Sequence, residues 1–486
     1  MSNPFFPCHR VPAMLKPVFS LLAATTVLAG CSLIPDYLRP EAPVPAAWPQ
    51  ADSATRSDSP LLGDLSWKEF FRDPALQGLI QQALQNNRDL RVAALNIEVA
   101  RATYRVSESA LFPQVNGTGS FTSQQVPKSV NSSQKDVVTR TYQANLGVTS
   151  WELDFFGKLS SQEKQALESL LATREAREAT RISLIAEVAN AALTLYGDRA
   201  LLALTEETLA SREESLRLIE RSFQNGVSSQ VDVAQARTAI ETARVNRVKY
   251  QRQVEQDKNA LTLLLGSPFD ESSLPAPLSL ETVSLVEDLP AGLPSEVLLR
   301  RPDVVQAEHS LKAANANIGA ARAAFFPSIS LTGSGGLSSG TLDALTASPA
   351  WTFMPQITVP IFTAGRNQAN LDSAKANRDI AIATYEKAIQ SAFREVSDAL
   401  AARATLTDQI KAQSALTEAS GDSYRLSRAR YDRGIDSYLT VLDSQRSLYS
   451  AQQDLISVRV TRLSNLVTLY KVLGGGFERP APAPAE

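Results

Sequence analysis

The sequence predicts a mainly α-helical protein with a transmembrane β-barrel contribution, and three observations carry this prediction. The segment around Gly226 reappears 208 positions later around Gly434, which indicates an internal two-fold repeat. No proline interrupts residues 158–265 or 363–477 in a chain with 26 prolines, and a proline inside a helix costs roughly 3 kcal/mol. Between the helical stretches, apolar and polar side chains alternate, as they do in β-strands. Each repeat is therefore expected to contain a helix, two strands, a very long helix, a turn and a final helix.

The composition of the 486-residue chain excludes several classes of protein. Its net charge of −3 gives no reason to expect nucleic acid as a partner. It has two cysteines, Cys8 and Cys31, and two histidines, His9 and His309. Removal of the N-terminus, argued next, leaves one of each, which is too few for a histidine dyad or for a metal site of cysteine and histidine ligands. We therefore expect neither an enzyme nor a metal-binding protein.

Residues 1–30 are typical of a secretory signal peptide, with a basic start, an apolar run over 17–29 and small residues before the cut. The apolar run is too short for a stable transmembrane helix. The four residues that end at Cys31, Leu-Ala-Gly-Cys, resemble the lipobox of bacterial lipoproteins. This resemblance implies cleavage before Cys31, with a diacylglycerol on its sulfur and an N-acyl chain on its new amine. Ser32 in place of aspartate implies sorting to the outer membrane. No other cofactor is expected, and Met14 is an alternative start of the chain.

Prolines and the repeat divide the rest of the chain into five segments. Six prolines within residues 35–60 favour an extended tether between the lipid and the folded part. Asp73 is expected to cap a helix that starts at Pro74. The expected segments are a lipid-anchored tether at 31–73, a first repeat at 74–266, a connector at 267–294, a second repeat at 295–474 and a flexible tail at 475–486.

The longest helices are expected at 158–225 and 366–433. Each has about 68 residues and a length of roughly 100 Å at 1.5 Å per residue. Shorter helices of about 37 residues are expected at 74–110 and 228–264 from the apolar periodicity. Compact domains do not need such long helices, but coiled-coil assemblies do. Because two short helices end to end match one long helix, we expect a cylinder wall in which stacked short helices lie beside continuous long ones.

Four strands are expected between the short and the long helices. The clearest lies at 350–363 and the next at 139–154, and weaker ones lie at 113–125 and 327–340. Alternation alone fits a half-buried soluble sheet equally well, but the lipid anchor and the lack of another spanning segment favour a barrel in the membrane. Four strands cannot close a barrel with a usable lumen, and lipid does not tolerate open sheet edges. Three copies are therefore expected to form a trimeric α-helical tunnel with a barrel of about twelve strands.

Several motifs in these segments resemble those of the outer membrane factor family, the TolC-like channels, and within it the OprM-like lipoproteins of drug efflux. The motifs are LAGC-SLIPDY at the N-terminus, RPD at 301–303, ARAAFFPSISL at 321–331, PIFTAG at 360–365 and LDSQRSL at 442–448. The resemblance implies a homotrimer in the outer membrane, lipid-anchored and extending into the periplasm. It also implies a passive exit duct for drugs, solvents and other small toxic compounds. The implied partners are a periplasmic adaptor and an inner-membrane transporter of the resistance-nodulation-division type.

The turn of the second repeat carries more charge than the turn of the first, which predicts that the second turn faces the pore axis. By resemblance, Leu439 forms an apolar constriction and Asp443 with Arg446 forms a charged one. Tyr431 and Arg433 are implied to form a hydrogen-bonded latch to the neighbouring helix pair. Apolar constrictions and rings of charge are usual ways to close an aqueous pore. Without the family resemblance, an ordinary solvated helix face would be the favoured interpretation of the same residues.

Two other functions remain open from the sequence. The chain could be the exit duct of a protein secretion system, although the lipobox and the OprM-like motifs disfavour this. It could also be a structural lipoprotein of the periplasm without a pore, although such a protein needs no alternating strands. The leading prediction is the outer membrane channel of a tripartite efflux pump.

Overall fold

The computed structural model describes residues 32–46, 48, 65–130, 132, 134–271, 280, 283–286 and 295–475. The predicted signal peptide at 1–30 and the predicted lipidation site Cys31 lie outside the described residues. Most of the predicted connector at 267–294 and all but one residue of the predicted tail at 475–486 also lie outside them.

The chain forms two compact units, and each unit takes residues from both repeats. Unit 1 consists of the described residues of Met1–Pro40, Glu98–Ala172 and Glu308–Thr384, and unit 2 consists of those of Glu41–Ile97, Thr173–Ala307 and Tyr385–Glu486. The boundaries predicted from the repeat therefore do not coincide with the compact units. The physical reason is that each long helix continues from one unit into the other, so that each repeat contributes to both.

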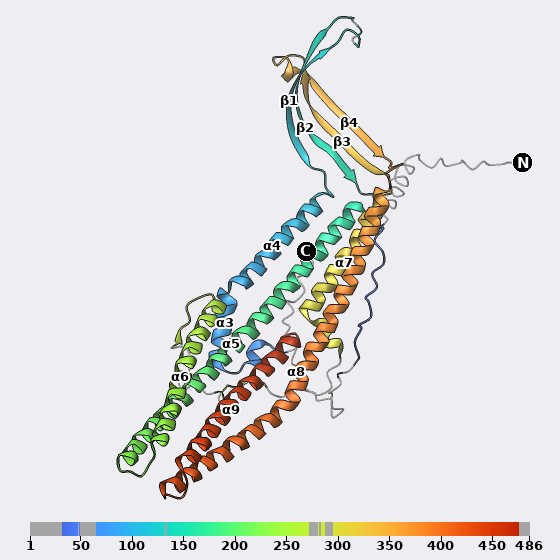
Figure 1. The fold of residues 1–486 in the computed structure, drawn as a ribbon. Helices are drawn as coiled ribbons and strands as arrows, with labels where there is room; N and C mark the ends of the chain where they lie inside the picture. Colours follow the sequence, from blue (N-terminus) through green and yellow to red (C-terminus); the bar gives the residue numbers. More distant parts are fainter. Residues whose placement is uncertain are drawn as a thin grey trace, which may run out of the picture. The chain divides into compact units, whose positions relative to one another are not determined.

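Unit 1 contains a four-stranded antiparallel sheet in the order β1-β2-β3-β4 (Figure 1). Its strands are β1 (Val115–Val126), β2 (Val137–Leu153), β3 (Ser328–Ser339) and β4 (Pro349–Thr358). The pairing of β2 with β3 joins the first repeat to the second. A bulge between Val148 and Trp151 adds one residue to β2, where Ser150 has a φ of 55°, and such bulges increase the local twist. Among the described residues, the outer edges of β1 and β4 pair with no further strand.

The bounds of β4 differ from the prediction, whereas the other three strands begin and end within two residues of it. The strand was expected to reach residue 363 and ends at Thr358. Thr358 pairs with Ser328, the first residue of β3, so the residues after it have no partner on that strand. Pro360 also lacks the N–H that a ladder hydrogen bond needs. The alternation of apolar residues therefore continues beyond the paired part of the strand.

The first part of the predicted tether is packed against a helix. In unit 1, residues 32–39 lie along α7 (Pro302–Ala323). Three side chains of α7 form hydrogen bonds with this segment. These contacts are Arg322 to the Leu33 carbonyl at 3.1 Å, Asn315 to the Pro35 carbonyl at 2.8 Å, and Arg39 to the Glu308 carboxylate at 2.8 Å. The segment is extended, as its prolines predict, but it is a strap held on the helix rather than a free linker.

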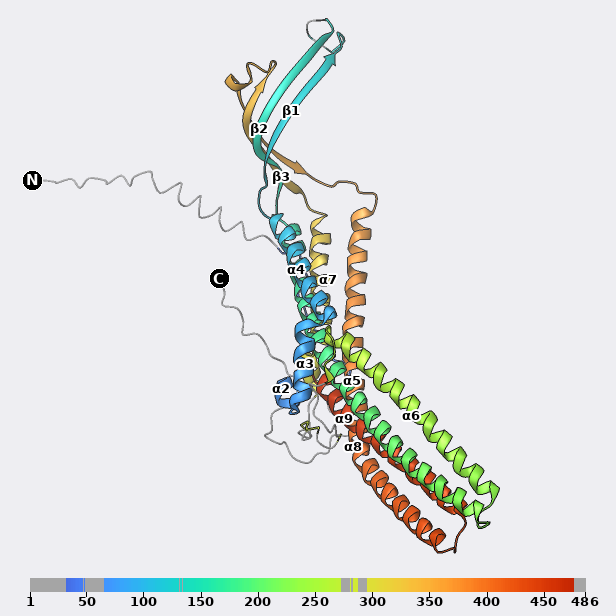
Figure 2. The same cartoon turned by 90° about the vertical axis from the view of Figure 1, so that its left-hand side faces the viewer.

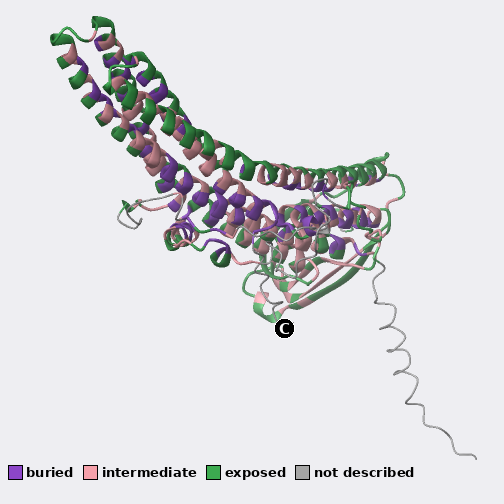
Figure 3. Ribbon diagram, turned by 90° about the horizontal axis from the view of Figure 1, so that it is seen from below, coloured by how far each residue is buried: buried purple, intermediate pink, exposed green. Residues whose placement is uncertain are grey.

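Unit 2 contains two helical hairpins, and each pairs the end of a long helix with the helix that follows it. The first hairpin joins α5 (Lys158–Gln224) to α6 (Gln230–Leu265), and the second joins α8 (Arg366–Asp432) to α9 (Tyr438–Val472). Figures 1 and 2 both show α6 running back beside the end of α5 and α9 running back beside the end of α8. Figure 3 shows buried residues along the sides of these helices, while the turns are exposed. The long helices start at the predicted residues and end one residue before the predicted ends.

The first helical stretch of the folded part is broken where one continuous helix was expected at 74–110. After the short α2 (Trp67–Phe70), the chain forms α3 (Pro74–Asn86) and α4 (Arg88–Ser109). The predicted cap is confirmed, because the Asp73 carboxylate accepts hydrogen bonds from the backbone at distances of 2.7 and 3.2 Å. Asn87 causes the break. Its backbone is extended, its side-chain oxygen accepts from Leu90 N at 3.0 Å, and its amide nitrogen donates to the Leu264 carbonyl at 2.9 Å.

The second repeat places an arginine in the same role. The chain passes from the 3₁₀ helix η3 (Ser295–Arg300) into α7 through Arg301, which aligns with Asn87 in the repeat. Arg301 Nη1 donates to the carbonyl oxygen of Val472 at 2.9 Å, and Val472 aligns with Leu264. Both residues therefore satisfy a carbonyl at the C-terminal end of the returning helix, where helices leave such groups without an intrahelical partner.

Within the described part of the chain, no helix is both long enough and apolar enough to cross a membrane.

Candidate functional site

The turns of the two hairpins have the same backbone conformation. In each turn, a glycine N–H donates to the carbonyl oxygen three residues earlier, and the next N–H donates to the oxygen five residues earlier. The four hydrogen bonds are Gly226–Phe223 at 2.9 Å, Val227–Ser222 at 2.9 Å, Gly434–Tyr431 at 2.8 Å and Ile435–Arg430 at 2.9 Å. The glycines have φ values of 75° and 74°, a backbone conformation that residues other than glycine rarely adopt. This is the Schellman arrangement, and it confirms the alignment of the two turns.

The two turns are stabilised by different side chains. In the first, Ser229 and Asp232 form a capping box, with hydrogen bonds of 2.8 and 3.2 Å between each side chain and the other's backbone N–H. In the second, Ser437 makes no such bond. There the Arg430 guanidinium instead binds both carboxylate oxygens of Asp436 at 2.6 and 3.0 Å. The hydrogen bond from Arg430 lowers the pKa of Asp436. The repeat thus keeps the backbone and replaces a serine–aspartate capping box by an arginine–aspartate ion pair.

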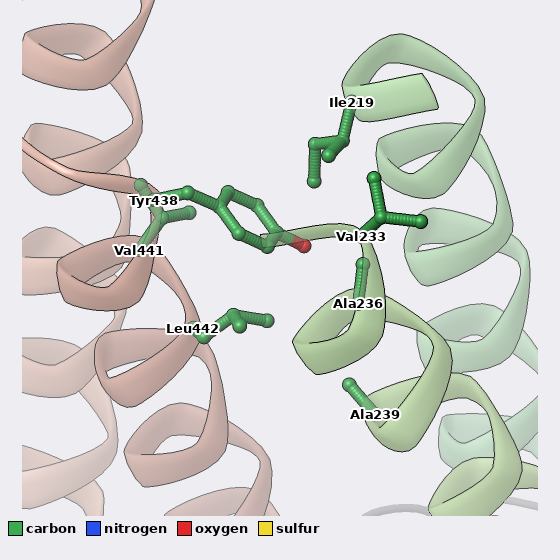
Figure 4. Packing of buried hydrophobic residues seen from close by; sticks show 7 residues of the cluster. All are labelled: Ile219, Val233, Ala236, Ala239, Tyr438, Val441 and Leu442. Atoms are coloured by element: carbon green, nitrogen blue, oxygen red, sulfur yellow. The ribbon is translucent and has the colours of Figure 1, made fainter. Parts of the chain in front are cut away.

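A buried hydrophobic cluster joins the two hairpins just above their turns (Figure 4). Its members come from α5, α6 and α9 and are Ile219, Val233, Ala236, Ala239, Tyr438, Val441 and Leu442. Val233 and Val441 occupy equivalent positions in the two repeats. The two repeats therefore share this one position of the cluster.

The predicted constriction residues lie on the exposed side of α9. Leu439 is 44% exposed, beside buried Tyr438, which belongs to the cluster. Asp443 and Arg446 are separated by 3.3 Å between carboxylate and guanidinium, and their side chains are 63% and 49% exposed. All three residues therefore point away from the cluster in a single chain. Such an arrangement is required of residues that line a pore, and their role in a gate stays a prediction.

The two residues predicted as a latch have different surroundings. The ring of Tyr431 is half-buried against the cluster, and its centroid lies 5.6 Å from that of Tyr438. Arg433 is exposed, and within the described residues its side chain forms no ion pair or hydrogen bond. In this single chain Tyr431 thus packs between the hairpins, while Arg433 is free to reach another chain. Their predicted hydrogen bonds to a neighbouring helix pair stay a prediction.

A cavity of about 650 Å³ lies between the two turns. It is lined by residues of both hairpins, including the charged side chains Arg221, Asp232, Arg428, Asp432 and Asp436. The end of unit 2 therefore has a polar recess above which the apolar cluster begins. Among the described residues, no group of three or more histidine, cysteine, aspartate or glutamate side chains is placed to hold a metal ion.

Sequence reasoning missed Arg430 and the pair that it forms with Asp436. The two residues are six positions apart, which is not a spacing that brings side chains together on a helix. Only the fold of the turn makes them neighbours. A signal was present, however, because their equivalents in the first repeat are Ser222 and Ser228, so both positions differ in charge between the repeats.

A second site was also missed, between α5 and α6 in unit 2. The carboxyl groups of Asp198 and Asp257 interact with each other. Burial, then the charge of Asp198, raises the pKa of Asp257 to about 7, and burial also raises the pKa of Asp198. One proton is therefore shared by the pair near neutral pH. In the second repeat the equivalent residues are Leu406 and Asn465, so this pair is not needed by the packing of every hairpin.

The shared proton predicts that the α5–α6 hairpin loses stability as the pH rises through 7. A carboxyl group with a raised pKa stabilises the fold below its ordinary pKa and loses this contribution above its raised pKa. The free energy of unfolding should fall by about 1 kcal/mol more between pH 6 and pH 8 in the wild type than in Asp257→Asn. Thermal unfolding at both pH values measures this. Glu241→Gln, an exposed change on α6, is the control and should behave like the wild type. Equal pH dependence in Asp257→Asn and the wild type would contradict the shared proton.

The comparisons with known proteins agree with this geometry. A family model described as "Outer membrane efflux protein" matches residues 79–267 and 293–475. The toluene efflux pump outer membrane protein TtgC of Pseudomonas putida is 53% identical over 468 residues, which are 96% of each chain. The outer membrane protein OprJ of Pseudomonas aeruginosa is 43% identical over 469 residues, 96% of this chain and 97% of its own. Among solved structures, the open state of the Neisseria gonorrhoeae MtrE outer membrane channel has a TM-score of 0.83 and 41% identity, and covers 92% of this chain and 98% of its own.

The fold and the comparisons define a channel-forming class of outer membrane protein. The chain belongs to the outer membrane efflux protein family. The predicted family and the predicted mainly helical fold with four strands per chain are confirmed. The two segments that match the family model also correspond to the two repeats seen in the sequence.

Proposed function

We propose that the protein is the outer membrane channel of an efflux pump, a passive exit duct for drugs, solvents and other small toxic compounds. The observation that carries this proposal is the match over nearly the whole chain to efflux pump outer membrane proteins, at 53% identity to TtgC. The names of such relatives include pumps for toluene, solvents and antibiotics. A duct breaks no covalent bond, so the protein is proposed to act without catalysis.

The sheet of unit 1 supports a trimeric assembly. A single chain presents the edges of β1 and β4 without a partner strand among the described residues. Unpaired backbone groups cost several kcal/mol each in lipid, so these edges must meet other strands if the sheet lies in the membrane. Three copies would pair β4 of one chain with β1 of the next and close a barrel of about twelve strands. The lipid on Cys31 would add a second attachment to the outer membrane.

The turns of unit 2 support a gate. The second turn presents Leu439, Asp443 and Arg446 on its exposed side, and three-fold symmetry turns each of these residues into a ring. Tyr431 and Arg433 are proposed to connect this hairpin to its neighbours. A periplasmic adaptor and an inner-membrane transporter of the resistance-nodulation-division type are the proposed partners that open and feed the duct.

Conductance tests the proposed function directly. The purified protein in a planar lipid bilayer should produce uniform single-channel steps, and crosslinking should show three copies. Gly147→Val provides a control, because a side chain at Gly147 would collide with the β3 backbone at Ser334 and should abolish the steps. A deletion strain should become sensitive to solvents and antibiotics and recover with the wild-type gene. A correctly folded trimer without conductance would contradict the proposal and favour a structural lipoprotein.

A further inference from the structure

A largely buried group of polar side chains joins the first hairpin of unit 2 to α9. It consists of Thr205 and Arg212 on α5, Asn246 on α6 and Tyr449 on α9, and we call it the polar joint. The Tyr449 hydroxyl lies 2.7 Å from Thr205 Oγ1 and accepts from Asn246 Nδ2 at 3.4 Å. Thr205 is fully buried and Tyr449 is 7% exposed. One tyrosine oxygen therefore connects three helices.

Arg212 occupies the centre of this joint at an energetic cost. The residue is 4% exposed, its Nη1 donates to the Ala239 carbonyl at 2.7 Å, and its guanidinium lies 5.4 Å from the centroid of the Tyr449 ring. Within the described residues no carboxylate forms an ion pair with it, and its Nε atom has no hydrogen-bond partner. Burial lowers the pKa of Arg212, but an arginine stays charged in proteins. A buried cation without an anion is unfavourable, so packing alone does not explain it.

The position of the joint connects it to the predicted gate. Tyr449 lies three residues beyond Arg446 on α9, a spacing that makes the two side chains neighbours on the helix surface. After burial, which is the larger cause, the positive charge of Arg446 also lowers the pKa of Arg212. Two like charges repel, so buried Arg212 disfavours an inward position of Arg446. The Arg446 guanidinium is accordingly exposed and lies 3.3 Å from the Asp443 carboxylate.

The repeat does not duplicate the joint. Arg212 of the first repeat aligns with Ser420 of the second, and Tyr449 of the second aligns with Glu241 of the first. The hairpins can therefore be built without a buried arginine at this position. A buried arginine that occurs in only one of the two repeats is expected to have a specific role. The same holds for the charge that is concentrated in one of the two turns.

We propose that Arg212 and Tyr449 are positioning residues of the gate. Through the polar joint they hold α9 against the first hairpin, and the charge of Arg212 directs Arg446 toward Asp443. This inference rests on the proposed function as a gated channel. Neither residue lines the pore, and both act through the placement of α9 and Arg446.

Three substitutions test the proposal by single-channel conductance of the full-length protein in planar bilayers. Tyr449→Phe keeps the ring and removes the hydroxyl, and Arg212→Met keeps the length of the side chain and removes the charge. Each should raise the conductance of the closed channel about two-fold, as loosening a constriction does, with the trimer intact. Tyr196→Phe, which removes a buried hydroxyl of α5 that has no hydrogen-bond partner, is the matched control and should conduct like the wild type.

The same measurement on Asp443→Ala/Arg446→Ala separates the joint from the gate. In that background, Tyr449→Phe should add little further conductance, because the pair it positions is already absent. If the gate variant conducts more than the wild type while both joint variants conduct like the wild type, the positioning role is overturned. The proposed channel function is then unaffected. If all variants conduct like the wild type, the gate itself fails and the joint with it. If Arg212→Met does not form a trimer, Tyr449→Phe decides, since it removes a single oxygen atom.

Discussion

Replacing Asp443 and Arg446 together by alanine is expected to raise single-channel conductance several-fold without disrupting the trimer. The two side chains are 63% and 49% exposed and contact each other at 3.3 Å. An exposed ion pair contributes only about 0–1 kcal/mol to stability, so the fold should not suffer. In a three-fold assembly the change would remove a ring of negative and a ring of positive charge from the proposed constriction, and such rings decide which ions pass.

The matched control for this change lies on α8. Asp422 and Arg425 form another exposed pair three residues apart, with a distance of 3.0 Å and side-chain exposures of 62% and 69%. Replacing both by alanine removes the same charges from a helix surface of unit 2 outside the predicted gate. This control should conduct like the wild type. Wild-type conductance in the Asp443/Arg446 variant would remove these residues from the gate.

The largest effect on stability is expected from Arg301→Ala, at a cost of about 3–5 kcal/mol. The Arg301 side chain is 9% exposed and binds Asp303 at 2.7 Å and Glu395 at 2.8 Å. It also donates to the Val472 carbonyl at the end of α9. Removing the guanidinium leaves two carboxylates and a carbonyl oxygen without their donor. Thermal unfolding of the purified protein should show a much lower midpoint, and proteolysis near the end of α9 should become faster.

Asn87→Ala serves as the internal standard for this prediction. Asn87 makes the corresponding hydrogen bond to the Leu264 carbonyl in the first repeat, but it carries no charge. Its loss should cost about 1–3 kcal/mol, the penalty of leaving a buried polar group without a partner. Arg301→Lys should be intermediate, because an ammonium cannot reproduce the bidentate geometry. If Arg301→Ala and Asn87→Ala shift the unfolding midpoint equally, the ion pairs contribute nothing beyond the shared hydrogen bond.

The features that local sequence determines were predictable. Gly226 and Gly434 have the positive φ that the two turns need, and they mark the ends of α5 and α8, which lie in proline-free stretches. The alignment of the repeats could then be tested in the structure at single hydrogen bonds. These predictions succeeded because each depends on residues within one turn or one helix, where backbone preferences decide the conformation.

The features that depend on distant residues were not predictable. The strap joins residues about 270 to 290 positions apart, and proline content indicates only that it is extended. The break at Asn87 follows from its bond to the carbonyl of Leu264, which no local pattern reveals. In the sequence, Arg212 looks the same as an arginine on an exposed helix face. Its burial depends on the packing of α5 against α6 and α9. The gate residues were named by family resemblance, and their exposure in one chain is compatible with that role.

The shared backbone of the two turns has a consequence for the symmetry of the assembly. In the proposed trimer, six Schellman turns would form one ring with nearly equivalent main chains. The ion pair between Arg430 and Asp436 occurs in only one turn of each chain, so the side chains reduce this pseudo-six-fold ring to three-fold symmetry. A partner protein could therefore meet the ring at six places by shape, but it could distinguish only three of them by charge.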